Sequence, residues 1–160
     1  MLVLGGGKSG KSAFVRSLAE DYLKVLYLVT MSPGSSQALF QHIKLRPANW
    51  DVLEEPVNLA TCLQQFAIHY DLIILDDISI WISNLLLLKQ NVYYETDCVL
   101  KELNKLKAKL VVSKELGLGI LPNSALVLRY VGLLSCVNQL FALTLSNVYF
   151  LIAGRAIKIK

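Results

Sequence analysis

Hydrophobic residues along this chain fall into short apolar runs that are separated by longer segments with helical spacing. A continuous apolar run of strand length is typical of a parallel strand that is buried on both faces of a sheet. The pattern predicts strands at Met1 to Leu4, Val25 to Val29, Trp50 to Leu53, Leu72 to Leu75, Leu110 to Ser113, Val148 to Ala153 and Ile157 to Ile159.

The segments between these strands predict helices, because their apolar residues recur every three or four positions. We expect the helix over Ile78 to Leu88 to be largely buried, the helix over Val99 to Lys107 to be charged and exposed, and Asn91 to Thr96 to form a loop. Strands that alternate with helices indicate a mostly parallel sheet, which binds ligands at the carboxyl ends of its strands. The other expected helices are Ala13 to Leu23, Ala38 to Lys44, Leu59 to His69 and a long one from about Ser124 to Leu145.

The composition supports one packed core, because 54% of the 160 residues are hydrophobic and only 18% are charged. We therefore expect a single domain over residues 1–160, with helices on both faces of the sheet. The three cysteines, Cys62, Cys98 and Cys136, are odd in number and far apart. This argues against a disulfide framework or a cysteine-based metal site and favours a reducing cytoplasm.

The chain is mildly basic, with a net charge of +4 and a pI near 9.0, and nucleotide phosphates would account for that balance. We expect no nucleic-acid partner, because the clustered lysines have a glutamate among them and indicate a solvated helix face. The cluster comprises Lys101, Lys105, Lys107 and Lys109, with Glu102 between them.

The segment from Tyr130 to Gly154 contains no charged residue, and a run of that length raises the question of a membrane span. Polar residues interrupt it in the middle, so we expect a helix followed by a strand and no span. We also expect no signal peptide, because the N-terminus leads directly into a glycine-rich loop. The interrupting residues are Asn138, Gln139, Ser146 and Asn147.

That glycine-rich loop, Gly5 to Ser12, fits the pattern G-x-x-x-x-G-K-[ST]. Glycines let the backbone curl so that several N–H groups point into one concavity, and the helix that follows adds the positive end of its dipole. Strand, loop and helix in this order indicate a polyphosphate site rather than a glycine turn without a ligand. Lys11 can reach the β- and γ-phosphates, which makes it a candidate catalytic residue, and the Ser12 hydroxyl can bind Mg²⁺. The candidate nucleotide-binding residues of the loop are Gly5, Gly6, Gly7, Lys8, Ser9, Gly10, Lys11 and Ser12.

Two acidic residues, Asp76 and Asp77, end the apolar run that starts at Leu72, which is the position of a Walker B carboxylate. Asp77 also precedes a predicted helix and can cap it. We assign Mg²⁺ to Asp76, together with Ser12. Metal binding by Asp76 and helix capping by Asp77 can hold at once. We call the apolar run from Leu72 that ends in these aspartates the acidic strand. The glycine loop and the acidic strand together predict an α/β P-loop NTPase (RecA-like) three-layer fold with a mostly parallel central sheet.

The chain has two histidines. His69 lies at the end of a predicted helix and is interpreted as structural. His42 has Lys44, Arg46 and Trp50 as neighbours, a setting in which imidazole chemistry is possible, although a lone histidine more often packs or lies on the surface.

Several further segments follow one another in the order found in a known family. They are QHIKLRPANW (Gln41 to Trp50), DDISIWISNLL (Asp76 to Leu86), ELGLGILP (Glu115 to Pro122), VNQ (Val137 to Gln139) and AGRAIKIK at the end. With GGGKSGKS, they resemble the adenosylcobinamide kinase/adenosylcobinamide-phosphate guanylyltransferase family of cobalamin biosynthesis. The resemblance spans nearly the whole chain, and H-x-x-x-R-P-x-x-W and E-x-G-x-G-I-x-P are its most diagnostic parts.

This resemblance implies a bifunctional enzyme that phosphorylates adenosylcobinamide and then transfers GMP from GTP through a guanylyl-histidine at His42. ATP and GTP would be its substrates and Mg²⁺ its cofactor. Arg46 fits a bidentate phosphate ligand. Glu115 would contact the nucleotide or the corrinoid, although a structural role fits it equally. Family resemblance also implies a homotrimer, and the apolar run from Leu133 onward suits a buried interface.

Some positions depart from the family pattern. Asparagine is usual where Lys114 stands, and the family's R-x-x-R-D falls on Leu128, Val131 and Gly132, although Arg129 lies close by. These changes leave the nucleotide site intact and affect corrinoid or second-step contacts. The alternative is therefore a diverged P-loop protein that keeps one of the two activities or only nucleotide binding. Upstream of the histidine, acidic residues and an arginine are replaced by Gly34, Ser35, Ser36 and Ala38.

Overall fold

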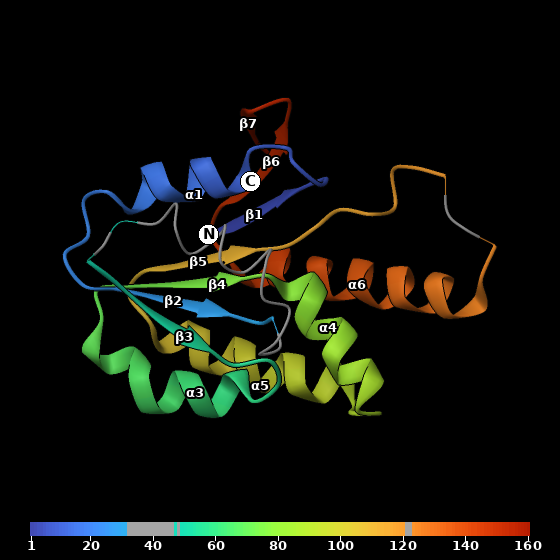
Figure 1. Cartoon of the computed structure of the whole chain (residues 1–160), viewed down its shortest axis with the longest axis horizontal. Coiled ribbons are helices and arrows are strands. Elements are labelled where there is room, and N and C mark those ends of the chain that lie inside the picture. Colours follow the sequence, from blue (N-terminus) through green and yellow to red (C-terminus); the bar gives the residue numbers. More distant parts are fainter. Residues whose placement is uncertain (32–46, 48, 121–122) are drawn as a thin grey trace.

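The structure is a computed structural model that describes residues 1–31, 47, 49–120 and 123–160 (Figure 1). Its described part contains a seven-stranded sheet with the order β3-β2-β4-β5-β1-β6-β7. All neighbouring strands are parallel except β6 and β7, which form an antiparallel hairpin. The strands are β1 (Leu2–Gly5), β2 (Val25–Val29), β3 (Trp50–Glu54), β4 (Leu72–Asp76), β5 (Lys109–Val112), β6 (Val148–Ile152) and β7 (Arg155–Lys158).

Helices cover both faces of this sheet, as the sequence predicts (Figure 1). One described helix, α1, lies on one face, and α3, α4, α5 and α6 lie on the other. The helices are α1 (Lys11–Ala19), α3 (Leu59–Phe66), α4 (Ile78–Leu87), α5 (Val92–Lys105) and α6 (Ala125–Thr144), and a 3₁₀ turn, η1 (Ala67–His69), follows α3.

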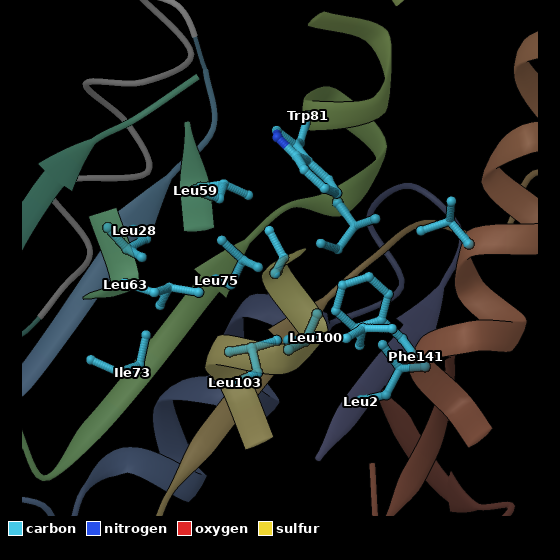
Figure 2. Packing of buried hydrophobic residues seen from close by; sticks show 14 of the residues in the cluster. Leu2, Leu28, Leu59, Leu63, Ile73, Leu75, Trp81, Leu100, Leu103 and Phe141 are labelled. Atoms are coloured by element: carbon cyan, nitrogen blue, oxygen red, sulfur yellow. The ribbon is translucent and has the colours of Figure 1, made fainter. Parts of the chain in front are cut away.

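Alternate residues of the central strands supply two separate cores. In β4, Ile73 and Leu75 pack in the core under α3 to α6, whereas Leu72 and Ile74 pack in the core under α1. Figure 2 shows the larger core, in which Trp81 of α4 lies between side chains of the sheet and of the other helices. Strands that are apolar on both faces are thereby buried on both faces, which explains why their runs are continuous.

The predicted strands are confirmed with small shifts of their ends, but the segment before α5 is different from the prediction. Asn91 to Thr96 is not a loop, because α5 begins at Val92 and Asn91 caps it by accepting a hydrogen bond from the Tyr94 N–H at 3.2 Å. The expectation of an exposed helix is also wrong, since Val99, Leu100 and Leu103 are buried. The polar side chains of the first turn make this segment look like a loop in the sequence, although the buried face of the helix already begins at Val92.

Helix α6 is long and apolar enough to cross a membrane, with a mean hydropathy of 1.6 over its best window. One face of the helix, however, packs in the larger core through Leu134, Val137 and Phe141. A helix that covers a sheet meets the same length and composition criteria, so α6 is weak evidence for a span. All three cysteines are free, in line with the expected lack of disulfides.

Candidate functional site

A cavity of about 520 Å³ opens at the carboxyl ends of β1, β2, β4 and β5. It brings together most of the predicted site: the glycine loop from Gly7 to Ser12, and the two aspartates at the end of β4 and directly after it. Such sheets bind ligands at this edge, where the loops after neighbouring strands converge. The lining residues are Gly7, Lys8, Ser9, Gly10, Lys11, Ser12, Ala13, Val29, Met31, Asp76, Asp77, Ile80, Val112 and Lys114.

The glycine loop takes a backbone path that requires glycine at two positions. Gly10 precedes α1 with φ 101°, and a Cβ there would lie 3.0 Å from the Cα of Gly154. A Cβ at Gly5, whose φ is 152°, would lie 2.6 Å from the carbonyl oxygen of Leu151. Side chains cannot be accommodated in such contacts without moving one of the two backbones. The phosphate-loop geometry therefore depends on the C-terminal hairpin.

A hydrogen bond joins the same two segments, because the Gly154 N–H donates to the Ser9 carbonyl at 3.0 Å. The turn of the β6–β7 hairpin thus lies against the middle of the glycine loop. The resemblance singled out the C-terminal segment, but its residues alone gave no sign that it supports the loop.

We expect Gly10→Ala to lower the free energy of unfolding by about 1–3 kcal/mol, because alanine at this φ is strained and its Cβ meets backbone. Urea unfolding followed by circular dichroism measures the change. Gly132→Ala is the matched control: its Cβ meets nothing within 4 Å in helix α6, where alanine is the better helix former. Equal losses in the two variants would contradict the contact argument.

Lys11, the first residue of α1, folds back over the glycine loop. Its Nζ donates to the Gly5 carbonyl at 2.8 Å and to the Gly6 carbonyl at 2.7 Å. Burial lowers the pKa of Lys11, the carboxylates of Asp77 and Asp76 partly counter that effect, and the charge of Lys114 adds to it. The ammonium is therefore held in the loop beside space that an anion can fill.

The two aspartates have different partners. Asp77 caps α4, as predicted: its carboxylate accepts from the Ile80 N–H at 2.8 Å and from the Ser79 hydroxyl. Asp76 ends β4 and accepts a hydrogen bond from the Tyr27 hydroxyl. Ser12 lines the same cavity from the second position of α1. The two residues that the sequence assigns to Mg²⁺ thus border one cavity, and both offer oxygen ligands.

Thr30 and Asn84 hold this edge of the sheet together, and sequence reasoning assigned neither of them a role. The Thr30 hydroxyl donates to the Asp77 carbonyl at 2.8 Å and accepts from the Asp77 N–H at 3.1 Å. Asn84 Nδ2 donates to the carbonyls of Thr30 at 2.8 Å and Pro56 at 2.9 Å. One amide in α4 therefore ties the segments that follow β2 and β3 to this helix. The available signal was a lone amide in a mostly apolar helix.

Glu115 lies beside the site through its backbone, because its N–H donates to the Gly5 carbonyl at 3.3 Å. Its carboxylate accepts from the Gly117 N–H at 2.6 Å and shapes the turn after β5. That contact supports the structural role that the sequence left open beside nucleotide or corrinoid binding. His42 and Arg46 lie outside the described residues, so their roles stay predictions.

The fold and cavity define the class of protein: β5 lies between the loop strand β1 and the acidic strand β4, so this is a RecA-like P-loop NTPase fold. A solved structure with a similar fold is the flagellar accessory protein FlaH from Methanocaldococcus jannaschii, with a TM-score of 0.55 and 14% identity over 99% of this chain and 76% of that one. The chain belongs to the cobinamide kinase / cobinamide phosphate guanyltransferase (CobU) family, whose model matches residues 1–159.

Similar proteins include two of known name. The bifunctional adenosylcobalamin biosynthesis protein CobP of Pseudomonas aeruginosa is 35% identical over 99% of this chain and 96% of its own length. The bifunctional adenosylcobalamin biosynthesis protein CobU of Salmonella typhimurium is 29% identical over 100% of this chain and 99% of its own length. The family resemblance found in the sequence is confirmed, and the chain is an enzyme of this kinase and guanylyltransferase class.

Proposed function

We propose that this enzyme carries out both reactions of its family: it phosphorylates adenosylcobinamide and then transfers GMP from GTP to the resulting phosphate. The observation that carries the proposal is the single cavity bordered by the glycine loop, Lys11, Ser12 and Asp76. A polyphosphate fits there, since loop N–H groups, the N-terminus of α1 and one ammonium all favour negative charge.

The same loop serves both steps in this proposal. In the kinase step, Lys11 and the loop N–H groups offset charge on the γ-phosphoryl group as it moves from ATP or GTP to the corrinoid hydroxyl. In the transferase step, the same donors offset charge on the pyrophosphate that leaves GTP. One nucleotide site can thus support two reactions that break different bonds of the triphosphate.

Mg²⁺ fits the donor set of the cavity, because Ser12 and Asp76 supply a hydroxyl and a carboxylate. Among the described residues no group of three histidine, cysteine, aspartate or glutamate side chains gathers, so the remaining ligands would be nucleotide oxygens and water. The ion would supply charge neutralisation between the β- and γ-phosphates when bound.

His42 is the proposed nucleophile of the transferase step, on the strength of the family motif. Neutral imidazole attacks the α-phosphorus of GTP, an N–P bond forms, the bond to the bridging oxygen breaks and pyrophosphate leaves. A phosphate oxygen of adenosylcobinamide phosphate then attacks the same phosphorus and releases the imidazole. Arg46 would hold a phosphate group in this step.

The test of this assignment is incubation with [α-³²P]GTP and Mg²⁺. We expect a protein-bound label that is acid-labile and alkali-stable, as a phosphoramidate is, and we expect His42→Ala to abolish it. Transfer from [γ-³²P]ATP to adenosylcobinamide should continue in His42→Ala, because the kinase step needs no histidine adduct. Equal loss of both activities would contradict the division of roles.

The second candidate function is retention of only one activity or of nucleotide binding. It is favoured by α6, where Leu128, Val131 and Gly132 replace the charged residues of the family pattern and Val131 is buried in the fold. Separate assays of the two steps with adenosylcobinamide distinguish this candidate from the first.

We also propose a cytoplasmic homotrimer, by family resemblance. Leu126, Leu128 and Leu143 are exposed on α6 and would suit a subunit interface. Light scattering of the purified protein tests the trimer directly.

A further inference from the structure

We propose that Lys114 is a second lysine of the nucleotide site and that it contacts the terminal phosphate of the triphosphate, opposite Lys11. The proposal rests on the nucleotide cavity of the proposed function and adds a contact that the glycine-loop motif does not contain. It concerns a position at which this chain departs from the family pattern, which has asparagine there.

The backbone around Lys114 is fixed on three sides. Its predecessor Ser113 donates its N–H to the Val3 carbonyl at 3.0 Å, and its successor Glu115 donates to the Gly5 carbonyl at 3.3 Å. The Lys114 carbonyl accepts from Asn138 Nδ2 of α6 at 3.0 Å, and Asn138 is 5% exposed. The segment after β5 is therefore attached to β1, to the start of the glycine loop and to α6, while Lys114 lines the cavity.

The Lys114 ammonium has only a loose partner among the described residues. Its Nζ lies 3.7 Å from Asp77 Oδ2, longer than the roughly 2.7–2.9 Å of a direct charge-assisted hydrogen bond. The other oxygen of Asp77 is already held by Ile80 and Ser79 at the start of α4. The Lys114 side chain is 37% exposed and that of Asp77 9%. The lysine can therefore turn to an incoming anion while Asp77 keeps its cap contacts.

Lys114 and Lys11 border the same cavity from different segments: Lys114 follows β5, and Lys11 is the first residue of α1. Their charges oppose each other, since Lys114 adds to the lowering of the Lys11 pKa that burial begins. An anion bound between them would be attracted by both. The facing carboxylates are those of Asp76 and Asp77, and this mixture of charges suits a triphosphate that carries a divalent cation.

The position of Lys114 indicates which phosphate it meets. In a glycine-loop site, the loop and the N-terminus of the helix surround the β-phosphate, and the end of the strand that carries Asp76 would hold the Mg²⁺ that neutralises the terminal phosphates. Lys114 lies next to Asp77, which directly follows Asp76 at the end of β4. It is therefore on the β4 side of the cavity. Lys114 is therefore placed to contact the terminal phosphate.

The same contact would act in both reactions. The terminal phosphoryl group moves to the acceptor in the kinase step, and it belongs to the leaving pyrophosphate in the transferase step. A cation at that phosphate offsets negative charge in either case.

The test compares Mg²⁺ complexes of guanosine 5′-[β,γ-imido]triphosphate and of GDP by isothermal titration calorimetry. Lys114→Met should weaken binding of the triphosphate analogue roughly ten- to hundred-fold, the range expected for one charge-assisted contact, and change GDP binding by only about two-fold or less. Lys114→Arg should retain most of the discrimination. Lys109→Met is the matched control, because Lys109 lies at the amino end of β5, away from the cavity at the carboxyl end. Its ammonium donates to the Leu106 carbonyl.

Equal weakening of both ligands in Lys114→Met, or no weakening of the triphosphate analogue, would overturn the proposal. The proposed function fails separately: a protein that shows the Lys114-dependent discrimination but forms no label from [α-³²P]GTP and no phosphorylated corrinoid would keep the contact and lose both activities. Absence of nucleotide binding by the unaltered protein would overturn both.

Discussion

Lys11→Ala should abolish both activities of this enzyme, with a loss of at least roughly 100-fold in each step, the size expected when a donor to developing charge is removed from a preorganised site. The physical reason is that both steps would use the one glycine-loop cavity in the proposed function, and Lys11 is held there by two loop carbonyls. Assays with [γ-³²P]ATP and [α-³²P]GTP measure the two losses in the same preparation.

Lys24→Ala is the control for this experiment, because Lys24 is exposed next to β2 at the amino end of the strand, away from the cavity. It should retain the rates of the unaltered protein. A Lys11→Ala protein that kept one of the two activities would show that the steps use separate nucleotide sites.

Trp81→Ala should lower the free energy of unfolding by about 3–5 kcal/mol, the usual cost of removing a large aromatic side chain from a core. Trp81 is 0% exposed and packs in the larger core (Figure 2). Its Nε1–H donates to the Val57 carbonyl at 2.9 Å. The substitution leaves a cavity and removes one of the two hydrogen bonds that the Val57 carbonyl accepts, since the Leu59 N–H still donates to it at 3.0 Å. For a domain with a total stability of roughly 5–15 kcal/mol, this is a large fraction. Urea unfolding followed by circular dichroism measures it.

Trp81→Phe separates the two contributions, because it keeps most of the apolar volume and removes the N–H. We expect a loss of about 1–3 kcal/mol from the lost hydrogen bond to the Val57 carbonyl and from the smaller ring. If Phe cost as much as Ala, the hydrogen bond rather than the packing would dominate.

The strands and the glycine loop could be predicted because each leaves a local signal in the sequence. Buried parallel strands such as Leu72–Asp76 are continuously apolar, and the loop Gly5 to Ser12 follows a fixed spacing. The start of α5 was missed because Tyr93, Tyr94 and Glu95 lie between its first two buried residues and make the segment look polar. The buried residues, Val92 and Thr96, are too few in this short segment to show helical spacing.

Contacts between distant residues left no such signal. Asn84 is recognisable as an unusual amide in an apolar helix, but nothing in the sequence says that it binds the carbonyls of Thr30 and Pro56. Asp77 could be predicted as a cap because capping is local, whereas its neighbour Lys114 comes from another strand. The family pattern marked Lys114 as a departure, and the fold supplied what Lys114 and Asn84 touch.

The contact between Gly154 and the glycine loop has a consequence for biosynthesis. During translation, β1 and the glycine loop leave the ribosome before the other described elements, and β6 and β7 leave it after them. Because a growing chain folds from its N-terminal side, the loop must wait for the hairpin before it can take its final path. Nucleotide bound in the completed site would therefore stabilise the finished fold, because the loop reaches its final path only when the hairpin is in place.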